Sequence, residues 1–153
     1  MYDLLLLLHS WLRWVVVALA IWAILENYKG WKSGLSYSAS VKKWNTFFIA
    51  SLHTQLVIGL ILYAFVSPMM QNILSDFGSS MKNSETRFWS VEHIFGMILG
   101  IAIAQIGSIK SKKQTTDSAK FEVAFKWFLA GFIIIMLMIP FGIWNVERPF
   151  FRF

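Results

Sequence analysis

Four long apolar runs, separated by charged segments, constrain this chain more than any other feature of its sequence. The runs cover residues 4–25, 44–66, 88–108 and 127–144. Each is close to the roughly 20 residues that an α-helix needs to cross a hydrocarbon core about 30 Å thick. The chain is 57% hydrophobic and 14% charged, as expected for an integral membrane protein. The sequence therefore predicts an all-α fold, a single domain over residues 1–153 that forms a four-helix up-and-down transmembrane bundle.

Lysines are concentrated in two of the three segments between the runs, and they predict how the chain is oriented. These residues are Lys29, Lys32, Lys42 and Lys43, followed by Lys110, Lys112, Lys113 and Lys120. Because cytoplasmic loops are enriched in Lys and Arg, we expect both segments inside and both termini on the outer side of the membrane. This orientation accounts for the formal net charge of +6. No stacking or base-reading motif points to nucleic acid.

Three histidines, His9, His53 and His93, each lie in a different apolar run. Ionisable residues at membrane depth are costly and by default indicate a functional site. At 1.5 Å per residue, His9 and His93 lie about 8 Å below the outer ends of their predicted helices, and His53 about 20 Å below. His9 and His93 form a level pair. For the deeper His53 three roles stay open: a further ligand, a proton carrier, or a partner of Gln55 and Gln105.

Two imidazoles at one depth on different helices match a bis-histidine haem site. The first and third helices of an up-and-down bundle most simply occupy diagonal positions, which leaves the axis for a flat ligand. The absence of Cys excludes iron–sulfur clusters and covalently attached c-type haem. We therefore expect non-covalent haem b, with iron bound by His9 and His93, serving electron transfer. The alternatives are a copper site completed by Met97 or Glu92, because thioethers suit Cu(I), and a cofactor-free accessory subunit of a larger membrane complex.

Arg13 follows His9 by one helical turn and stays charged in the membrane. Three partners remain open for it: Glu92, a haem propionate, and the membrane interface. The aromatic and basic tail 147–153 is expected on the outer side, either as an interfacial tail or folded back so that Arg148 reaches the same site. The candidate cofactor-binding residues are thus His9, Arg13, His53, Glu92, His93 and Arg148.

Small residues form a stripe in the third run. Gly96, Gly100 and Ala104 recur every four residues on the face that carries His93. A close helix–helix contact is one interpretation, and clearance for a porphyrin is the other. Pro140 and Gly142 in the fourth run indicate a kink that would make further room.

Several motifs resemble a family of small four-helix bacterial membrane proteins labelled cytochrome b-like. The segments are LHSWLRW at 8–14, HTQLVIGL at 53–60, RFWSVEH at 87–93 and RPF at 148–150. The resemblance spans nearly the whole chain. It implies a b-type haem protein of the bacterial inner membrane with functional residues at His9, Arg13, His53, Glu92 and His93. Separately, we expect this multi-pass chain to contact the lipid bilayer and, as a small bundle, to work within a larger respiratory or other membrane complex.

Overall fold

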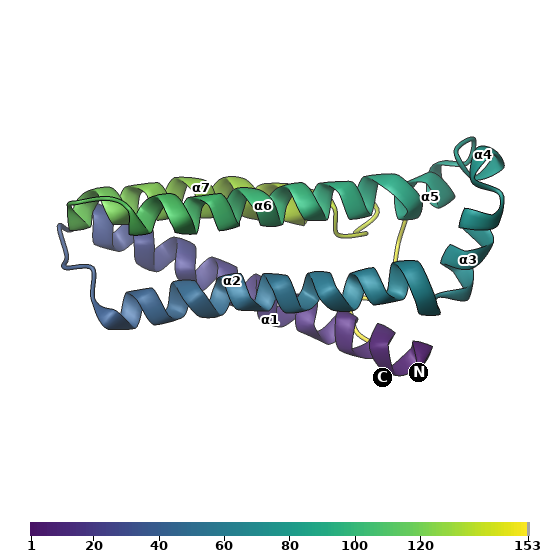
Figure 1. Cartoon of the computed structure of the whole chain (residues 1–153), viewed down its shortest axis with the longest axis horizontal. Coiled ribbons are helices and arrows are strands. Elements are labelled where there is room, and N and C mark those ends of the chain that lie inside the picture. The colour runs from purple at the N-terminus through teal and green to yellow at the C-terminus, as the bar shows by residue number, and fades with distance from the viewer. Residues whose placement is uncertain (153) are drawn as a thin grey trace.

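The structure, a computed structural model, describes residues 1–152 as an all-helical fold (Figure 1). The long helices are α1 (Tyr2–Lys32), α2 (Ala39–Ile61), α6 (His93–Lys112) and α7 (Asp117–Leu137). Two π-helical turns adjoin them, η1 (Leu62–Val66) after α2 and η2 (Phe88–Glu92) before α6. Three short helices connect η1 to η2, namely α3 (Pro68–Ser75), α4 (Phe77–Ser80) and α5 (Ser84–Arg87).

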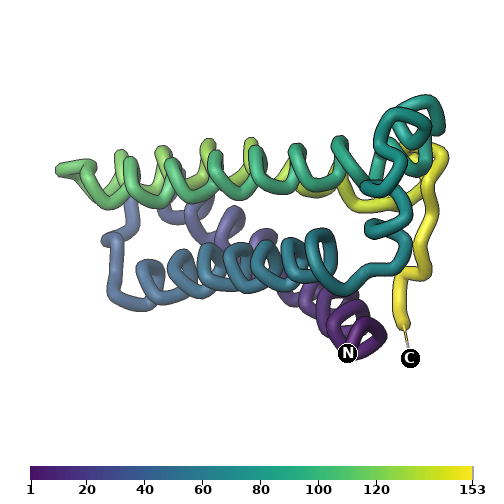
Figure 2. The backbone as a smooth tube through the Cα atoms, turned by 45° about the vertical axis from the view of Figure 1, so that its right-hand side comes forward, coloured from purple at the N-terminus to yellow at the C-terminus, as the bar shows by residue number. Residues whose placement is uncertain are grey.

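The long helices pack in the order expected for an up-and-down bundle. Helix α1 packs beside α2 and α7, and α6 packs beside α7 and α2, so α1 and α6 occupy diagonal positions. The expectation of diagonal first and third helices is confirmed. Both termini lie at the end of the bundle that carries α3, α4 and α5, as Figures 1 and 2 show.

Three helical segments are long and apolar enough to cross a membrane: Tyr2–Lys32, Ala39–Val66 and Ser84–Lys112. Their outward-facing side chains include Trp22, Phe95 and Ile98, which are 51%, 67% and 45% exposed. Exposed apolar surface of this extent fits contact with a lipid bilayer. The first half of α7 carries Asp117, Lys120, Glu122 and Lys126, so only its second half is continuously apolar.

Helix boundaries differ most from the sequence-based expectation at the fourth helix, which was expected at 127–144. The observed helix begins at Asp117, because the Thr116 side chain accepts a hydrogen bond from the Ala119 N–H and caps it. It ends at Leu137, so Pro140 lies beyond the helix and does not kink it. Proline lacks the N–H donor and clashes with the preceding turn, which explains the early end. Likewise the segment 67–87, expected as a loop, contains the short helices α3 to α5.

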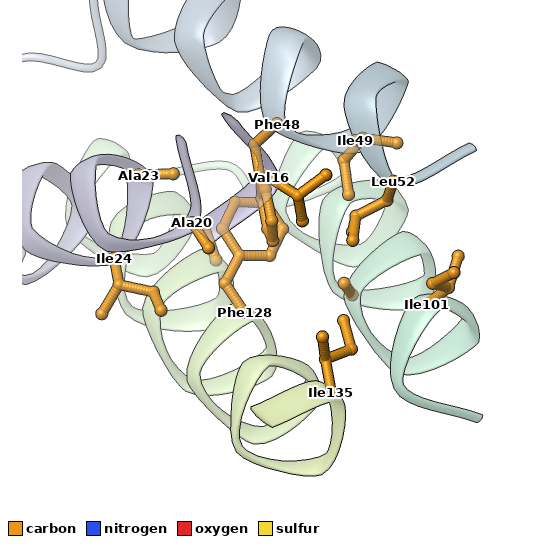
Figure 3. Packing of buried hydrophobic residues seen from close by; sticks show 12 residues of the cluster. Val16, Ala20, Ala23, Ile24, Phe48, Ile49, Leu52, Ile101, Phe128 and Ile135 are labelled. Atoms are coloured by element: carbon orange, nitrogen blue, oxygen red, sulfur yellow. The ribbon is translucent and has the colours of Figure 1, made fainter. Parts of the chain in front are cut away.

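The core lies where the four long helices meet midway along the bundle (Figure 3). Phe48 of α2 and Phe128 of α7 are fully buried and pack edge to face, with ring centroids 5.1 Å apart. The small-residue stripe of α6 faces α7: a Cβ on Gly100 would lie 3.0 Å from the Gly131 carbonyl oxygen. The stripe is therefore a close helix–helix contact, and the alternative of porphyrin clearance is wrong.

Candidate functional site

A cavity of about 190 Å³ lies at the end of the bundle where the termini meet. Its walls come from α1, α2, η1, α3, η2, α6, the end of α7 and the segment after α7. Both level histidines line it, His9 from α1 and His93 from α6. The diagonal arrangement of α1 and α6 thus brings together two imidazoles that are 84 positions apart in numbering, on a single cavity.

His93 is held in one tautomer by the backbone that follows α7. Its Nδ1 lies 2.8 Å from the carbonyl oxygen of Met138. A carbonyl oxygen only accepts hydrogen bonds, so Nδ1 carries the hydrogen and donates it. In the neutral ring Nε2 then keeps its lone pair. A ring that donates from one nitrogen to a backbone carbonyl and offers the other is the usual state of a histidine that binds a metal.

His9 is positioned by α2. The Gln55 side-chain amide donates a 2.9 Å hydrogen bond to the His9 backbone carbonyl. Gly59, one turn further along α2, lies against the ring, since a Cβ there would be 3.1 Å from His9 Cε1. The His9 Nδ1 atom is buried and has no hydrogen-bond partner. Contacts from α2 therefore set the position of the ring, while its two nitrogens form no hydrogen bond with the described residues.

Cations surround the cavity without an acid among its lining residues. Arg13 of α1 lines it together with Arg148 and Arg152 of the C-terminal segment. Arg148 Nη2 lies 3.2 Å from Met69 Sδ, and its guanidinium lies 4.9 Å from the centre of the Trp89 ring. Neither contact neutralises the charge. A cavity that guanidinium groups line, with no carboxylate among its described lining residues, favours a ligand that brings its own negative charge.

The C-terminal segment folds back across this end of the bundle, as Figure 2 shows, and Arg148, Pro149 and Arg152 form part of the cavity wall. A tight reversal sends it there: Gly142 and Asn145 have φ of 90° and 56°, and the Gly142 N–H donates to the Val146 carbonyl at 3.1 Å. The left-handed backbone at these positions suits glycine and asparagine. The reversal folds the tail back and places Arg148 beside the cavity. This is one of the two positions that the sequence left open for the tail.

Three hydrogen-bond donors on α1 hold the folded-back C-terminal segment in place. Arg13 Nη2 and Trp14 Nε1 donate to the Phe150 carbonyl at 2.7 and 2.9 Å, and Trp11 Nε1 donates to the Arg152 carbonyl at 2.8 Å. The Trp14 ring also stacks on Phe150, with centroids 6.4 Å apart. The motif LHSWLRW therefore supplies a histidine to the cavity. It also supplies the three hydrogen-bond donors that hold the C-terminal segment, the cover of the cavity, in place.

Unpaired polar atoms gather at this end of the molecule. The buried side-chain atoms without a hydrogen-bond partner are His9 Nδ1, Arg13 Nε, Gln55 Oε1, Trp89 Nε1 and Glu92 Oε2. All but Glu92 belong to residues that line the cavity. Buried polar groups are nearly always paired in a folded protein, so a cluster of exceptions indicates that something else satisfies them.

Two candidate residues lie away from the cavity. Glu92 pairs with Arg87 at 2.7 Å, so the Arg13–Glu92 pair that was one expectation does not form. Glu92 precedes His93 directly, and the next helical position points about 100° away. His53 is exposed on the outer surface of α2, because the inward face of that helix runs through Leu52, Leu56 and Gly59. Gln55, one of its proposed partners, bonds to α1.

Sequence reasoning missed several residues of the cavity wall. Arg152 was treated only as part of the tail, and Tyr63 was not considered, although both line the cavity. Tyr63 lies in η1 and donates a 2.9 Å hydrogen bond to the Ser90 carbonyl in η2. Both π-helical turns therefore border the site, and such turns occur frequently at functional sites. No pattern in the sequence signals them.

The donor set of the cavity fits haem b in chemistry, while the volume depends on the cover. Two imidazoles, one with its tautomer fixed, and arginines that form no ion pair within residues 1–152 are what iron and two propionates require. With the C-terminal segment in place, the cavity of about 190 Å³ is smaller than the roughly 300 Å³ of the smallest usual ligand sites. A macrocycle therefore needs this end of the molecule, where the C-terminal segment forms one wall, to widen. Among residues 1–152, no group of three or more histidine or acidic side chains is placed to hold a metal ion.

Comparison with protein-family models, with curated proteins and with solved structures finds no match to this chain.

Proposed function

We propose that this chain is a membrane haem b protein for electron transfer, in which His9 and His93 would hold the iron. In this proposal it crosses a bacterial inner membrane four times, with both termini and the cavity at the outer face. The two connecting segments 33–38 and 113–116 would then face the cytoplasm, because lysines at positions 29, 32, 42, 43, 110, 112, 113 and 120 lie in or beside them. The apolar second half of α7, which ends at Leu137, would form the outer part of the fourth crossing.

The hydrogen bond between His93 Nδ1 and the Met138 carbonyl, at 2.8 Å, carries the proposal. A histidine used only for helix packing would be served by either tautomer. Here the backbone selects the tautomer that leaves Nε2 basic, and it does so at a cavity shared with a second histidine. That combination is what binding to iron requires.

Each residue of the cavity has a distinct part in this proposal. His93 and His9 would bind iron, and Arg13 and Arg148 would face the propionates. When bound, haem b supplies one-electron transfer between ferrous and ferric iron. The apolar wall, which includes Ile139, limits access of water, and a low local dielectric strengthens the attraction of the guanidinium groups for carboxylates.

The test is the visible spectrum of the protein, produced with sufficient haem and purified in mild detergent. We expect a Soret band of low-spin haem. His9→Ala and His93→Ala should each abolish the band or convert it to a high-spin form. His53→Ala is the matched control, because its side chain lies outside the cavity, and it should leave the spectrum unchanged.

Other results would reject the proposal or change the ligand pair. A colourless protein would reject the haem b proposal. Stoichiometric copper or zinc without iron would favour a histidine-based metal site instead. Loss of the band on His53→Ala alone would show that the pairing of His9 with His93 is wrong. A protein free of both pigment and metal that retains a tightly bound second protein would indicate an accessory subunit.

A further inference from the structure

The outward position of His53 is unusual for a helix of this kind. His53 lies near the middle of the 28-residue apolar segment Ala39–Val66, about 20 Å from either end at 1.5 Å per residue. Its side chain is exposed and has no hydrogen-bond partner among residues 1–152. From that depth an imidazole cannot reach either interface. Ionisable groups in such positions almost always face protein rather than lipid.

The residues around His53 form a regular stripe. Thr46, Ala50, His53 and Val57 follow one another at steps of four, three and four, and all are exposed. This spacing is that of the contact seam between two helices that cross at a small angle. Ala50, one turn before the histidine, is small, which lets two helix backbones approach closely there. We call these four residues the α2 seam.

The histidine is the polar group that the α2 seam leaves unpaired. The Thr46 hydroxyl donates to the Lys42 carbonyl at 2.8 Å, and the neighbouring Thr54 hydroxyl donates to the Ala50 carbonyl at 3.0 Å. Both threonines are thus satisfied within α2. A partner on this face must therefore offer a hydrogen-bonding group to one imidazole, at the middle of the membrane, between Ala50 and Val57.

We propose that the α2 seam pairs with the α2 seam of a second copy of this chain, so that His53 hydrogen-bonds to His53 of the partner subunit. Copies of one membrane protein share the same orientation, so a two-fold axis along the membrane normal places each residue opposite itself at equal depth. Residues on the seam of a parallel helix pair meet their own equivalents. A neutral imidazole carries one donor and one acceptor nitrogen, which makes it complementary to a second imidazole.

The absence of native Cys makes disulfide trapping a direct test. Ala50→Cys and Val57→Cys each place one thiol on the α2 seam. Ile98→Cys is the matched control, because Ile98 is 45% exposed on α6, away from the α2 seam. After oxidation in native membranes, we expect a reducible product of twice the chain mass from Ala50→Cys or Val57→Cys and none from Ile98→Cys.

The role of the histidine is tested in the Ala50→Cys background. His53→Leu should lower the trapped fraction about threefold, the effect of one interhelical hydrogen bond in a membrane. Circular dichroism of the purified variant checks that it remains folded. The proposal is overturned by trapping that does not exceed the Ile98→Cys control, by a product of another mass, or by a trapped fraction that His53→Leu leaves unchanged. None of these measurements depends on bound haem.

Discussion

The two ends of the bundle differ in what their helices enclose. At the end near the lysine-rich segments, a Cβ on Gly30 would overlap the Phe121 ring, and a Cβ on Gly107 would overlap Trp127. There the buried side chains of Asn27 and Asn45 hydrogen-bond to each other, and each donates a further hydrogen bond, Asn27 to the Ala23 carbonyl and Asn45 to the Tyr37 hydroxyl. At the other end the helices enclose a cavity of about 190 Å³, and the buried polar atoms without partners collect around it.

This contrast separates the part of the molecule that maintains the fold from the part that is available for a ligand. Interlocked side chains and satisfied polar groups stabilise a bundle. Unpaired polar atoms around a cavity do not, and proteins retain such strain at functional sites. The closed end therefore holds the helices in register, and the hollow end, covered by the C-terminal segment, is the place where His9 and His93 can act.

The largest expected effect comes from adding one methyl group at each end. Gly107→Ala should lower the free energy of unfolding by about 2–3 kcal/mol, because the new Cβ overlaps Trp127 at its Cβ, which cannot move without the backbone. Gly59→Ala at the hollow end should change it by less than about 1 kcal/mol, since its new contact is the His9 ring beside the cavity.

Denaturant unfolding in detergent measures both changes. Gly78→Ala is the control, because nothing lies within 4 Å of the added Cβ. Equal losses for Gly107→Ala and Gly59→Ala would mean that the two ends are packed alike.

A smaller effect is expected from the polar network of the closed end. Asn27 donates to the Asn45 side-chain oxygen at 2.8 Å, and Asn45 donates to the Tyr37 hydroxyl at 2.8 Å. Asn27→Leu should destabilise the protein by about 1–2 kcal/mol, because it leaves a buried oxygen of Asn45 without its donor. Thermal unfolding against the exposed Asn72→Leu control checks this. An Asn27→Leu variant as stable as that control would show that the network contributes nothing.

At the hollow end, a conservative change should loosen the cover without harming the fold. Trp14→Phe keeps an aromatic ring beside Phe150 but removes the N–H that donates to the Phe150 carbonyl at 2.9 Å. Loss of about 1 kcal/mol from one hydrogen bond should increase the open population, and hence chymotrypsin cleavage near Phe150, about fivefold. Trp44→Phe on α2 is the control. Cleavage at the rate of the unchanged protein would mean that the segment is held by other contacts.

The smallest expected effect is a pH dependence at the closed end. Asp117 accepts a hydrogen bond from the Tyr37 N–H at 3.0 Å and pairs with Lys120, and these contacts hold its pKa below the usual value. A lowered pKa adds stability above the unfolded pKa, and this stability is lost as pH falls through the folded pKa. Asp117→Asn should therefore flatten the acid side of the stability profile slightly. An unchanged profile would contradict this assignment.

The sequence predicts the positions of the helices better than the directions of their side chains. Apolar runs locate α1, α2 and α6, and depth counting brings His9 and His93 to one cavity. The outward direction of His53 escapes this reasoning, because lipid-facing and core-facing positions of α2 are both apolar and no amphipathic pattern marks the inner face. The same limit applies to Glu92, which lies one residue from His93 and pairs with Arg87.

The cover of the cavity depends on long-range contacts that spacing does not reveal. Its reversal requires left-handed backbone at Gly142 and Asn145, and its final position depends on donors from Trp11, Arg13 and Trp14, more than a hundred residues earlier in the chain. Aromatic residues near a helix end indicate a membrane interface equally well. For this reason the sequence left the position of Arg148 open and gave no sign of Arg152 at the cavity.

Titration of the haem-free protein with haemin, in detergent and followed at the Soret band, tests the central claim most directly. We predict saturation at one haem per chain with a low-spin spectrum, and no specific binding to the double variant in which His9 and His93 are both alanine. Failure of the unchanged protein to bind haemin, or equal binding by the double variant, would contradict the assignment of the hollow end as a haem site.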